Sequence, residues 1–190
     1  MKIELFPLEK ITIDGHDIFP GQSKKQFIDC LGQPEVIYEN YGGGSFRYHY
    51  PEFAFDVDLN DNIEFVEFLY GHEGTIKPVI YGVSAFDITQ EELMAILKEK
   101  NNGPYNEDDC GADFPNISVG VFYENDDVYF ETIGIGGKVV NPVLTGGLPV
   151  EIRADLWYYL VLRRRCCFRN CVRCGSFTDL SADRTEGAAV

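Results

Sequence analysis

The chain has 190 residues, 45% of them hydrophobic and 14% aromatic, which is enough apolar material for one or two packed cores and excludes a disordered chain. Sixteen Lys and Arg stand against 31 Asp and Glu, which gives a net charge of -15. Such an acidic body repels nucleic acid and anionic membranes and attracts basic proteins, so we expect no nucleic acid and no membrane as partner. The first residues lack the apolar run of a secretory signal, and no stretch reaches the ~20 apolar residues that span a bilayer, so we expect a cytoplasmic location.

A first short helix is predicted within Gly21–Pro34. Ser23 followed three residues later by Gln26 has the spacing of a capping box, and Gly32 supplies a stop signal. The apolar stripe of this helix consists of Phe27, Ile28 and Leu31. The stripe predicts a helix that packs one face against the rest of the unit.

Strands are predicted around this helix because apolar and polar residues alternate with a period of two. The segments with this pattern, or with a short apolar run, are 2–13, 36–38, 46–50, 53–59 and 63–70, with a turn at 60–62. One polar face along such strands is typical of an antiparallel sheet that is covered on one side only. We expect the first helix to cover the apolar face of this sheet.

A second helix is predicted over residues 90–100, with Thr89 and Glu92 as its capping box. It is followed by an acidic loop, Asn106–Asp113, and by strands at 117–123 and 128–135 with a turn at 125–127. Thr89 lies 66 positions after Ser23, and the second turn lies 65 positions after the first. These offsets indicate a duplicated unit. The alternative is two ordinary α+β segments, because capping boxes and Asn/Asp turns are common.

The sequence therefore predicts an α+β protein of two tandem units, each a capped helix packed on an antiparallel sheet, over residues 1–75 and 76–140. Residues 76–88 connect the units and are expected to pair into a sheet as well. Residues 141–190 form an atypical Arg- and Cys-rich tail. Positions 1–150 hold nine Lys and Arg against 26 Asp and Glu, whereas positions 151–190 hold seven against five. This break in charge and repeat predicts a tail that is poorly ordered or not native to the domain.

Four of the six cysteines crowd into the tail, namely Cys166, Cys167, Cys171 and Cys174. The last three match the C-x3-C-x2-C spacing of cluster-binding radical SAM enzymes, but only 16 residues follow Cys174, too few for a barrel of β-α units. The four thiolates are weak candidates for zinc, because structural zinc sites usually take their ligands from two separated pairs, whereas these four cysteines form one local group. Reduced surface thiols are the preferred interpretation, so no cofactor and no metal are expected. Cys30 is expected to be a small core residue.

Two kinds of titratable residue are candidates for chemistry. Asp56 and Asp58 share a predicted polar strand face with Glu64 and Glu67 of the next strand, where they could remain solvated, bind a basic partner or perform acid–base catalysis. His49 is the only histidine within a predicted strand, and a solvated role is preferred for it. No nucleophile elbow and no phosphate-binding loop is present. No catalytic residue is therefore assigned.

Several segments of the sequence resemble known protein families. They are Phe19–Ser23, Leu31–Glu35, Tyr81–Phe86, Leu97–Gly103, Ile117–Val121 and Thr132–Gly136, and they span roughly residues 1–138. Within this span, Gly21–Pro34 with the strand hairpin that follows resembles the helix-then-sheet unit of beta-lactamase-inhibitor-like and SmpA-like domains, which sometimes occur in tandem. The set resembles small cytosolic proteins of Bacillus-type bacteria associated with immunity to polymorphic or LXG-type toxins. The resemblance implies a binding protein and brings no catalytic residues.

We therefore expect an immunity-type binding protein, not an enzyme, that occludes a basic toxin domain through an acidic surface. The expected contact residues are Asp56, Asp58, Glu64, Glu67, Glu107, Asp108, Asp109 and Asp113, with Tyr48 and Tyr129 as exposed aromatic anchors. The alternatives are a small hydrolytic or ligand-binding enzyme that uses Asp56, Asp58 and His49, which requires a pocket joining His49 to a carboxylate, or a scaffold domain.

Overall fold

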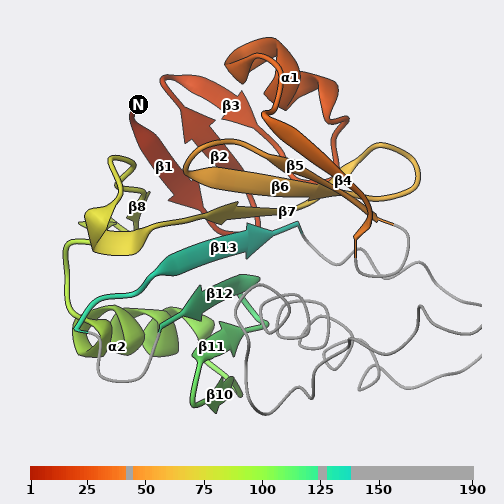
Figure 1. Ribbon diagram of the computed structural model, residues 1–190. Coiled ribbons are helices and arrows are strands. Elements are labelled where there is room, and N and C mark those ends of the chain that lie inside the picture. Colours follow the sequence, from red (N-terminus) through yellow and green to blue (C-terminus); the bar gives the residue numbers. More distant parts are fainter. Residues whose placement is uncertain (42–44, 124–127, 138–190) are drawn as a thin grey trace, which may run out of the picture. The chain divides into compact units, whose positions relative to one another are not determined.

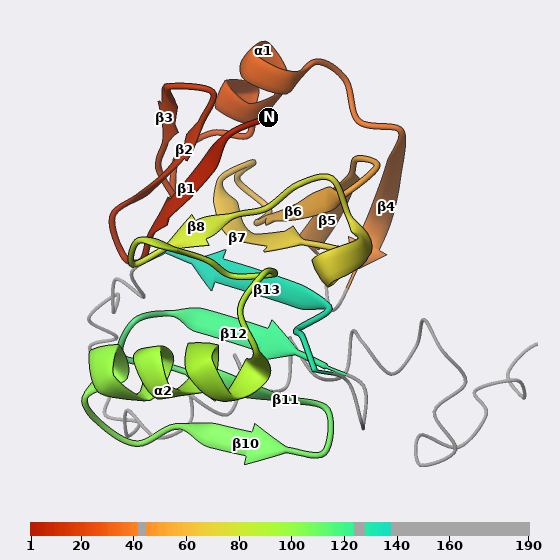
Figure 2. The same ribbon diagram turned by 90° about the vertical axis from the view of Figure 1, so that its left-hand side faces the viewer.

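The backbone forms two sheets and two α-helices, as the computed structural model in Figures 1 and 2 shows. The structure describes residues 1–41, 45–123 and 128–137, all within the compact unit Met1–Leu148. The predicted α+β class is confirmed for this part of the chain. The tail and its cysteines lie outside the described residues.

The larger sheet is antiparallel and has eight strands in the order β10-β11-β12-β13-β7-β6-β5-β4. Its strands are β4 (Val36–Tyr41), β5 (Ser45–His49), β6 (Phe53–Val57), β7 (Ile63–Phe68), β10 (Asn106–Asp108), β11 (Gly111–Phe114), β12 (Val119–Phe122) and β13 (Thr132–Gly136). Each half is a four-stranded meander, and the last strands of the two halves, β7 and β13, pair in the middle. One continuous sheet thus replaces the two separate sheets expected from the sequence.

The smaller sheet is mixed, in the order β3-β2-β1-β8-β9. Its strands are β1 (Ile3–Phe6), β2 (Lys10–Ile13), β3 (His16–Ile18), β8 (Val79–Ile80) and β9 (Val83–Ser84). The first three form a meander, and β1 pairs in parallel with β8. The prediction that residues 76–88 also pair into a sheet is confirmed. Both sheets contain strands from both sides of the predicted boundary at residue 75.

Both helices cover the same face of the large sheet. Helix α1 (Lys25–Leu31) places Phe27 against Phe55 and Phe53, with ring centroids 4.5 and 6.4 Å apart. The cross-strand neighbours of Phe53, one on each successive strand, lie on this same face and lead to Glu107 on β10. Glu107 forms an ion pair at 3.4 Å with Lys98 of α2 (Gln90–Asn101), so α2 covers this face as well. Helix α1 lies over the β4–β7 half and α2 over the β10–β13 half (Figures 1 and 2). One hydrophobic core fills this face and includes the inward residues of the small sheet.

The opposite face contains a row that takes one residue from every strand of the large sheet. In order across the sheet, the row is Val36, His49, Ala54, Glu67, Gly134, Gly120, Asp113 and Asn106. Gly134 leaves room for Phe65, whose ring lies so close to it that a Cβ there would overlap the ring. Of the four acids predicted for a polar face, this face holds Asp56 and Glu67, together with Arg47 and His49.

The second helix begins as the sequence predicts, but the first does not. Thr89 and Glu92 form the expected reciprocal capping box, and α2 ends at Asn102 in the left-handed region. In α1 the N-cap is Lys24, which is itself helical and makes no side-chain cap bond, and the Ser23 hydroxyl accepts a long hydrogen bond, 3.4 Å, from the N–H of Lys25 and not from that of Gln26. The predicted Ser23–Gln26 box is therefore wrong. The stop at Gly32 is confirmed.

The ends of several predicted strands are also corrected. Strand β6 stops at Val57 and β7 at Phe68, before a 3-10 turn, η1 (Gly71–Glu73). The strand predicted for residues 128–135 begins only at Thr132, which is 69 positions after the start of β7. The match between the two hairpins at an offset of 65 is thus wrong in register. The physical reason is that residues 128 and 129 offer their carbonyls to Gln90 at the start of α2, at 2.8 and 3.1 Å.

Candidate interaction surface

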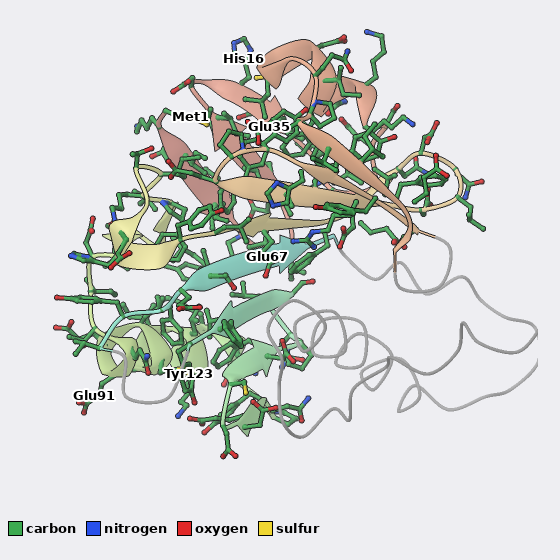
Figure 3. The ribbon with its side chains drawn as sticks, viewed as in Figure 1. Met1, His16, Glu35, Glu67, Glu91 and Tyr123 are labelled. Atoms are coloured by element: carbon green, nitrogen blue, oxygen red, sulfur yellow. The ribbon has the colours of Figure 1, made fainter. Side chains whose placement is uncertain are left out.

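The acidic residues predicted to share an open sheet face are not all exposed. Asp56 and Glu67 retain only 1% and 6% of their surface, and Arg47, which lies beside them on the same face, retains 7%. The Arg47 guanidinium lies 3.4 Å from both carboxylate oxygens of Asp56 and makes an ion pair with Glu67. Glu67 is labelled in Figure 3. Thr132 donates a hydrogen bond to Glu67 at 3.2 Å. We call Arg47, Asp56 and Glu67 the buried ion cluster.

The buried ion cluster has a structural role, which corrects the expectation of exposed acids at Asp56 and Glu67. Two carboxylates and one guanidinium out of water are stable only while they are mutually paired, because desolvating a lone charge costs several kcal/mol. The sequence signal was present, since Arg47 alternates on the same face as the acids. The cross-strand register that brings the three together was not readable from the sequence.

The other two predicted face acids lie elsewhere. Asp58 sits after β6 and holds the turn, because its Oδ1 accepts hydrogen bonds from the backbone N–H groups of Asn60 and Asn62, both at 2.8 Å. These hydrogen bonds lower the pKa of Asp58 in spite of its partial burial, which acts in the opposite direction. Glu64 is exposed at a bulge in β7, where the register with β6 shifts, and therefore does not join the face of Glu67.

His49 lies on the same face as the buried ion cluster and is half-buried. Burial, and next the positive charge of Arg47, lower its pKa. The negative charges of Glu35 and Glu67 act on this pKa in the opposite direction. In the part of the chain that the structure describes, His49 makes no hydrogen bond or ion pair with a carboxylate, and the hollow described below does not include it.

The predicted acidic loop is a β-hairpin formed by β10 and β11. Glu107, Asp108 and Asp109 are exposed, whereas Asp113, on β11, is buried. The Asp108 carboxylate accepts hydrogen bonds from the N–H groups of Cys110 and Gly111, which fixes the turn at the tip. The hairpin therefore presents three of its four predicted acids to solvent.

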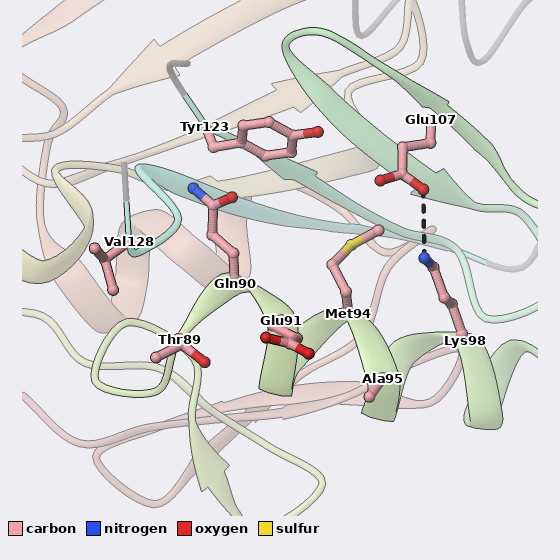
Figure 4. A pocket seen from close by; sticks show the side chains of 9 residues that line it. All are labelled: Thr89, Gln90, Glu91, Met94, Ala95, Lys98, Glu107, Tyr123 and Val128. Carbon is pink, nitrogen blue, oxygen red and sulfur yellow. Dashed lines mark ion pairs between the residues drawn. The ribbon is translucent and has the colours of Figure 1, made fainter. Parts of the chain in front are cut away.

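A hollow of about 660 Å³ lies between α2 and this hairpin (Figure 4). We call it the α2 groove, and its lining is Thr89, Gln90, Glu91, Met94, Ala95, Lys98, Glu107, Tyr123 and Val128. The Lys98–Glu107 ion pair closes one end, and Val128 is 57% exposed. The groove thus joins acidic and apolar side chains beside the exposed acids of the hairpin. Sequence reasoning missed it, because helix and hairpin meet only in the fold.

The two predicted aromatic anchors have different environments. Tyr48 is buried, stacks on Phe55 at 4.9 Å and accepts a hydrogen bond from Lys24 at 2.7 Å, so its assignment as an exposed anchor is wrong. Tyr129 is partly exposed and stacks on His72 with ring centroids 4.3 Å apart. Of the two, Tyr129 has the exposure that an anchor needs.

No metal site is found among the described residues, since nowhere in them do three His, Cys, Asp or Glu side chains come together to hold an ion. Cys30 packs beside the core as expected, and burial raises the pKa of its thiol. The candidates Cys166, Cys167, Cys171 and Cys174 lie outside the described residues. Neither helix of the described part is long and apolar enough to cross a membrane.

Comparison of the sequence with models of protein families, with curated proteins and with solved structures finds no match in any of the three.

Proposed function

We propose that the protein is a cytoplasmic immunity-type inhibitor, which binds a toxin domain in a stoichiometric complex and occludes it. The observation that carries the proposal is the α2 groove with the hairpin beside it. Glu91 and Glu107 line a hollow that also offers Met94 and Val128, and Asp108 and Asp109 are exposed next to it. A groove of this composition suits a basic side chain with an apolar stem, because the stem packs while the charged head meets Glu91 and shares Glu107 with Lys98, which pairs with it at 3.4 Å.

The mechanism is electrostatic capture followed by steric occlusion. A chain with a net charge of -15 draws a basic domain toward it, and complementary charge raises association rates by roughly 10- to 1000-fold at low salt. The exposed acids Glu64, Glu91, Glu107, Asp108 and Asp109, with Tyr129 as anchor, form the revised contact set. Asp56, Glu67, Asp113 and Tyr48 support the sheet from within.

We also infer that the two helix-plus-meander units arose by duplication. Each helix precedes a four-stranded meander, and the corresponding strands β7 and β13 pair antiparallel at the centre, as a local two-fold relation requires. The units have diverged in helix length, 7 residues against 12, and in capping.

Binding and protection of growth test this function directly. The probe is the product of the gene immediately upstream, titrated into the full chain by calorimetry and expressed with and without it in cells. The proposal predicts a one-to-one complex and growth that is restored by the full chain. Absence of both binding and protection would reject the immunity role.

A further inference from the structure

Strand β4 forms one outer edge of the eight-stranded sheet. It pairs with β5 on one side, and on its other side no strand of the described part is placed. Its residues Val36, Ile37 and Tyr38 are exposed by 44%, 48% and 36%. By the register with β5, Val36 and Tyr38 lie on the face of the buried ion cluster, and Ile37 lies on the core face beside Tyr48. Both faces of this edge are therefore apolar.

The other sheet edges in the described part are shorter than β4, and two of them carry charged residues. Strand β10 has three residues and carries Glu107 and Asp108. Strand β3 has three residues, with Asp17 paired to Lys10 at 2.7 Å, and β9 has two. Short and charged edges resist strand addition, whereas a longer apolar edge invites it. β4 has six residues and is the longest of these edges. Its register with β5 shifts between Tyr38 and Tyr41, so the regular apolar part of the edge is Val36, Ile37 and Tyr38.

We propose that β4 receives an extended segment of the partner protein by strand addition. The proposal deepens the binding function proposed above and rests on it. An added strand takes up hydrogen bonds along the outer edge, and side chains on alternate faces give specificity. Apolar residues of the segment pack beside Val36, Ile37 and Tyr38.

The charges beside this edge define the chemistry of the segment. Glu35 and Glu39 are exposed and lie two residues to either side of Ile37, Glu39 at the point where the register with β5 shifts, and Figure 3 places Glu35 next to β4. A second copy of this acidic chain would align its own glutamates with these, and like charges opposite each other destabilise a sheet. The segment that fits has three apolar residues between two basic ones. Basic residues then stand opposite Glu35 and Glu39, and the central apolar residue stands opposite Ile37.

A defined peptide tests this proposal without knowledge of the partner. The probe is the fluorescently labelled peptide acetyl-Thr-Lys-Val-Ile-Val-Lys-Thr-amide, titrated into the full chain by anisotropy. Two controls carry two N-methyl groups each, one on the two valines and one on the isoleucine and the second lysine. Because these positions alternate, one control loses donors that face β4 and the other loses donors that face solvent. We expect one control to match the parent peptide and the other to bind about 10-fold more weakly or worse.

A pair of protein variants locates the site. Ile37→Lys places a positive charge on the β4 edge, and Asn106→Lys makes the same change in charge on the protected β10 edge. We expect Ile37→Lys to weaken the peptide at least about 10-fold and Asn106→Lys to change it less than about 2-fold. Far-UV circular dichroism and thermal unfolding confirm that both variants are folded.

Each contrary result overturns the proposal. Absence of binding, equal binding of both N-methylated controls and the parent, or equal effects of the two variants would show that no strand adds at β4. A dimer in sedimentation that Ile37→Lys converts to a monomer would assign the edge to a second copy. A shift in the emission of Trp157, the only tryptophan, on Ile37→Lys without peptide would assign it to the chain's own tail. The proposed function fails separately, through absence of binding and protection with the upstream gene product.

Discussion

Removal of Arg47 is predicted to destabilise the protein more than most single substitutions. Methionine fills a similar volume, so Arg47→Met deletes the charge and leaves Asp56 and Glu67 buried beside an apolar side chain. The side chains of the three residues expose only 8%, 2% and 8% of their surface, so water cannot replace the guanidinium. Breaking a buried ion pair on one side typically costs about 3–5 kcal/mol. For a folded unit of this size, such a loss lowers Tm by about 10–20 °C.

Urea unfolding followed by circular dichroism at pH 7 measures this loss in Arg47→Met, in Glu67→Gln and in the double variant. If the two side chains act as a pair, the double variant is more stable than additive losses predict, by about 1–3 kcal/mol. The triple variant Arg47→Met, Asp56→Leu, Glu67→Met should recover at least half of the stability that Arg47→Met loses, because no uncompensated buried charge remains. A loss below about 1 kcal/mol for Arg47→Met, or strict additivity, would refute the reasoning.

Three further outcomes are expected. Thr89→Ala should cost about 1 kcal/mol in urea unfolding through loss of the capping box, whereas Ser23→Ala, which loses only a long 3.4 Å hydrogen bond from the N–H of Lys25, should cost much less, and equal losses would contradict the assignment. Gly134→Ala should cost about 1–3 kcal/mol because its Cβ overlaps the ring of Phe65, and Phe65→Ala in the same chain should relieve part of that cost; no relief would refute the contact. The Thr75 hydroxyl, with the N–H groups of Thr75 and Ile76, donates hydrogen bonds to Glu52 and lowers its pKa. Glu52→Gln should therefore lower the free energy of unfolding at pH 7, and this effect should disappear as the pH falls below about 4, where the carboxylate becomes protonated. An equal loss of stability at pH 7 and pH 3 would contradict the linkage.

The parts of the fold that depend on local signals could be predicted from the sequence. The exposed capping box of the N-cap residue Thr89 fixes the start of α2, and Gly32, which has a positive φ, ends α1. At the start of α1 the same signal fails, because the backbone there is held by the 60s turn. The N–H of Gly21 donates to Ile63, and that of Lys24 donates to Asp61, at 2.7 and 2.8 Å. Tertiary pairing thus overrides the local preference of Ser23.

The candidate surface was predictable only in part, because its members come from distant elements. Period-two alternation placed Asp56 and Glu67 on the correct face, but burial depends on the neighbour that the register supplies, which is Arg47. Tyr48 was assigned to solvent although it packs beneath Lys24, since alternation does not tell which face a helix covers. The α2 groove and the β4 edge arise from strand order, and strand order has no signature within any single segment.

The central claim, that acids around the α2 groove capture a basic partner, is tested most directly by the rate of association. The upstream gene product is mixed with the full chain and with two matched triple variants by stopped flow, at low and high salt. One variant neutralises the surface by Glu91→Gln, Glu107→Gln and Asp109→Asn. The other removes the same charge elsewhere by Glu9→Gln, Asp29→Asn and Glu73→Gln.

The account predicts that the first variant associates about 10-fold more slowly than the unmodified chain at low salt, that high salt removes most of this difference, and that the second variant stays within about 2-fold of the unmodified chain. Equal rates for the two variants at low salt would contradict it.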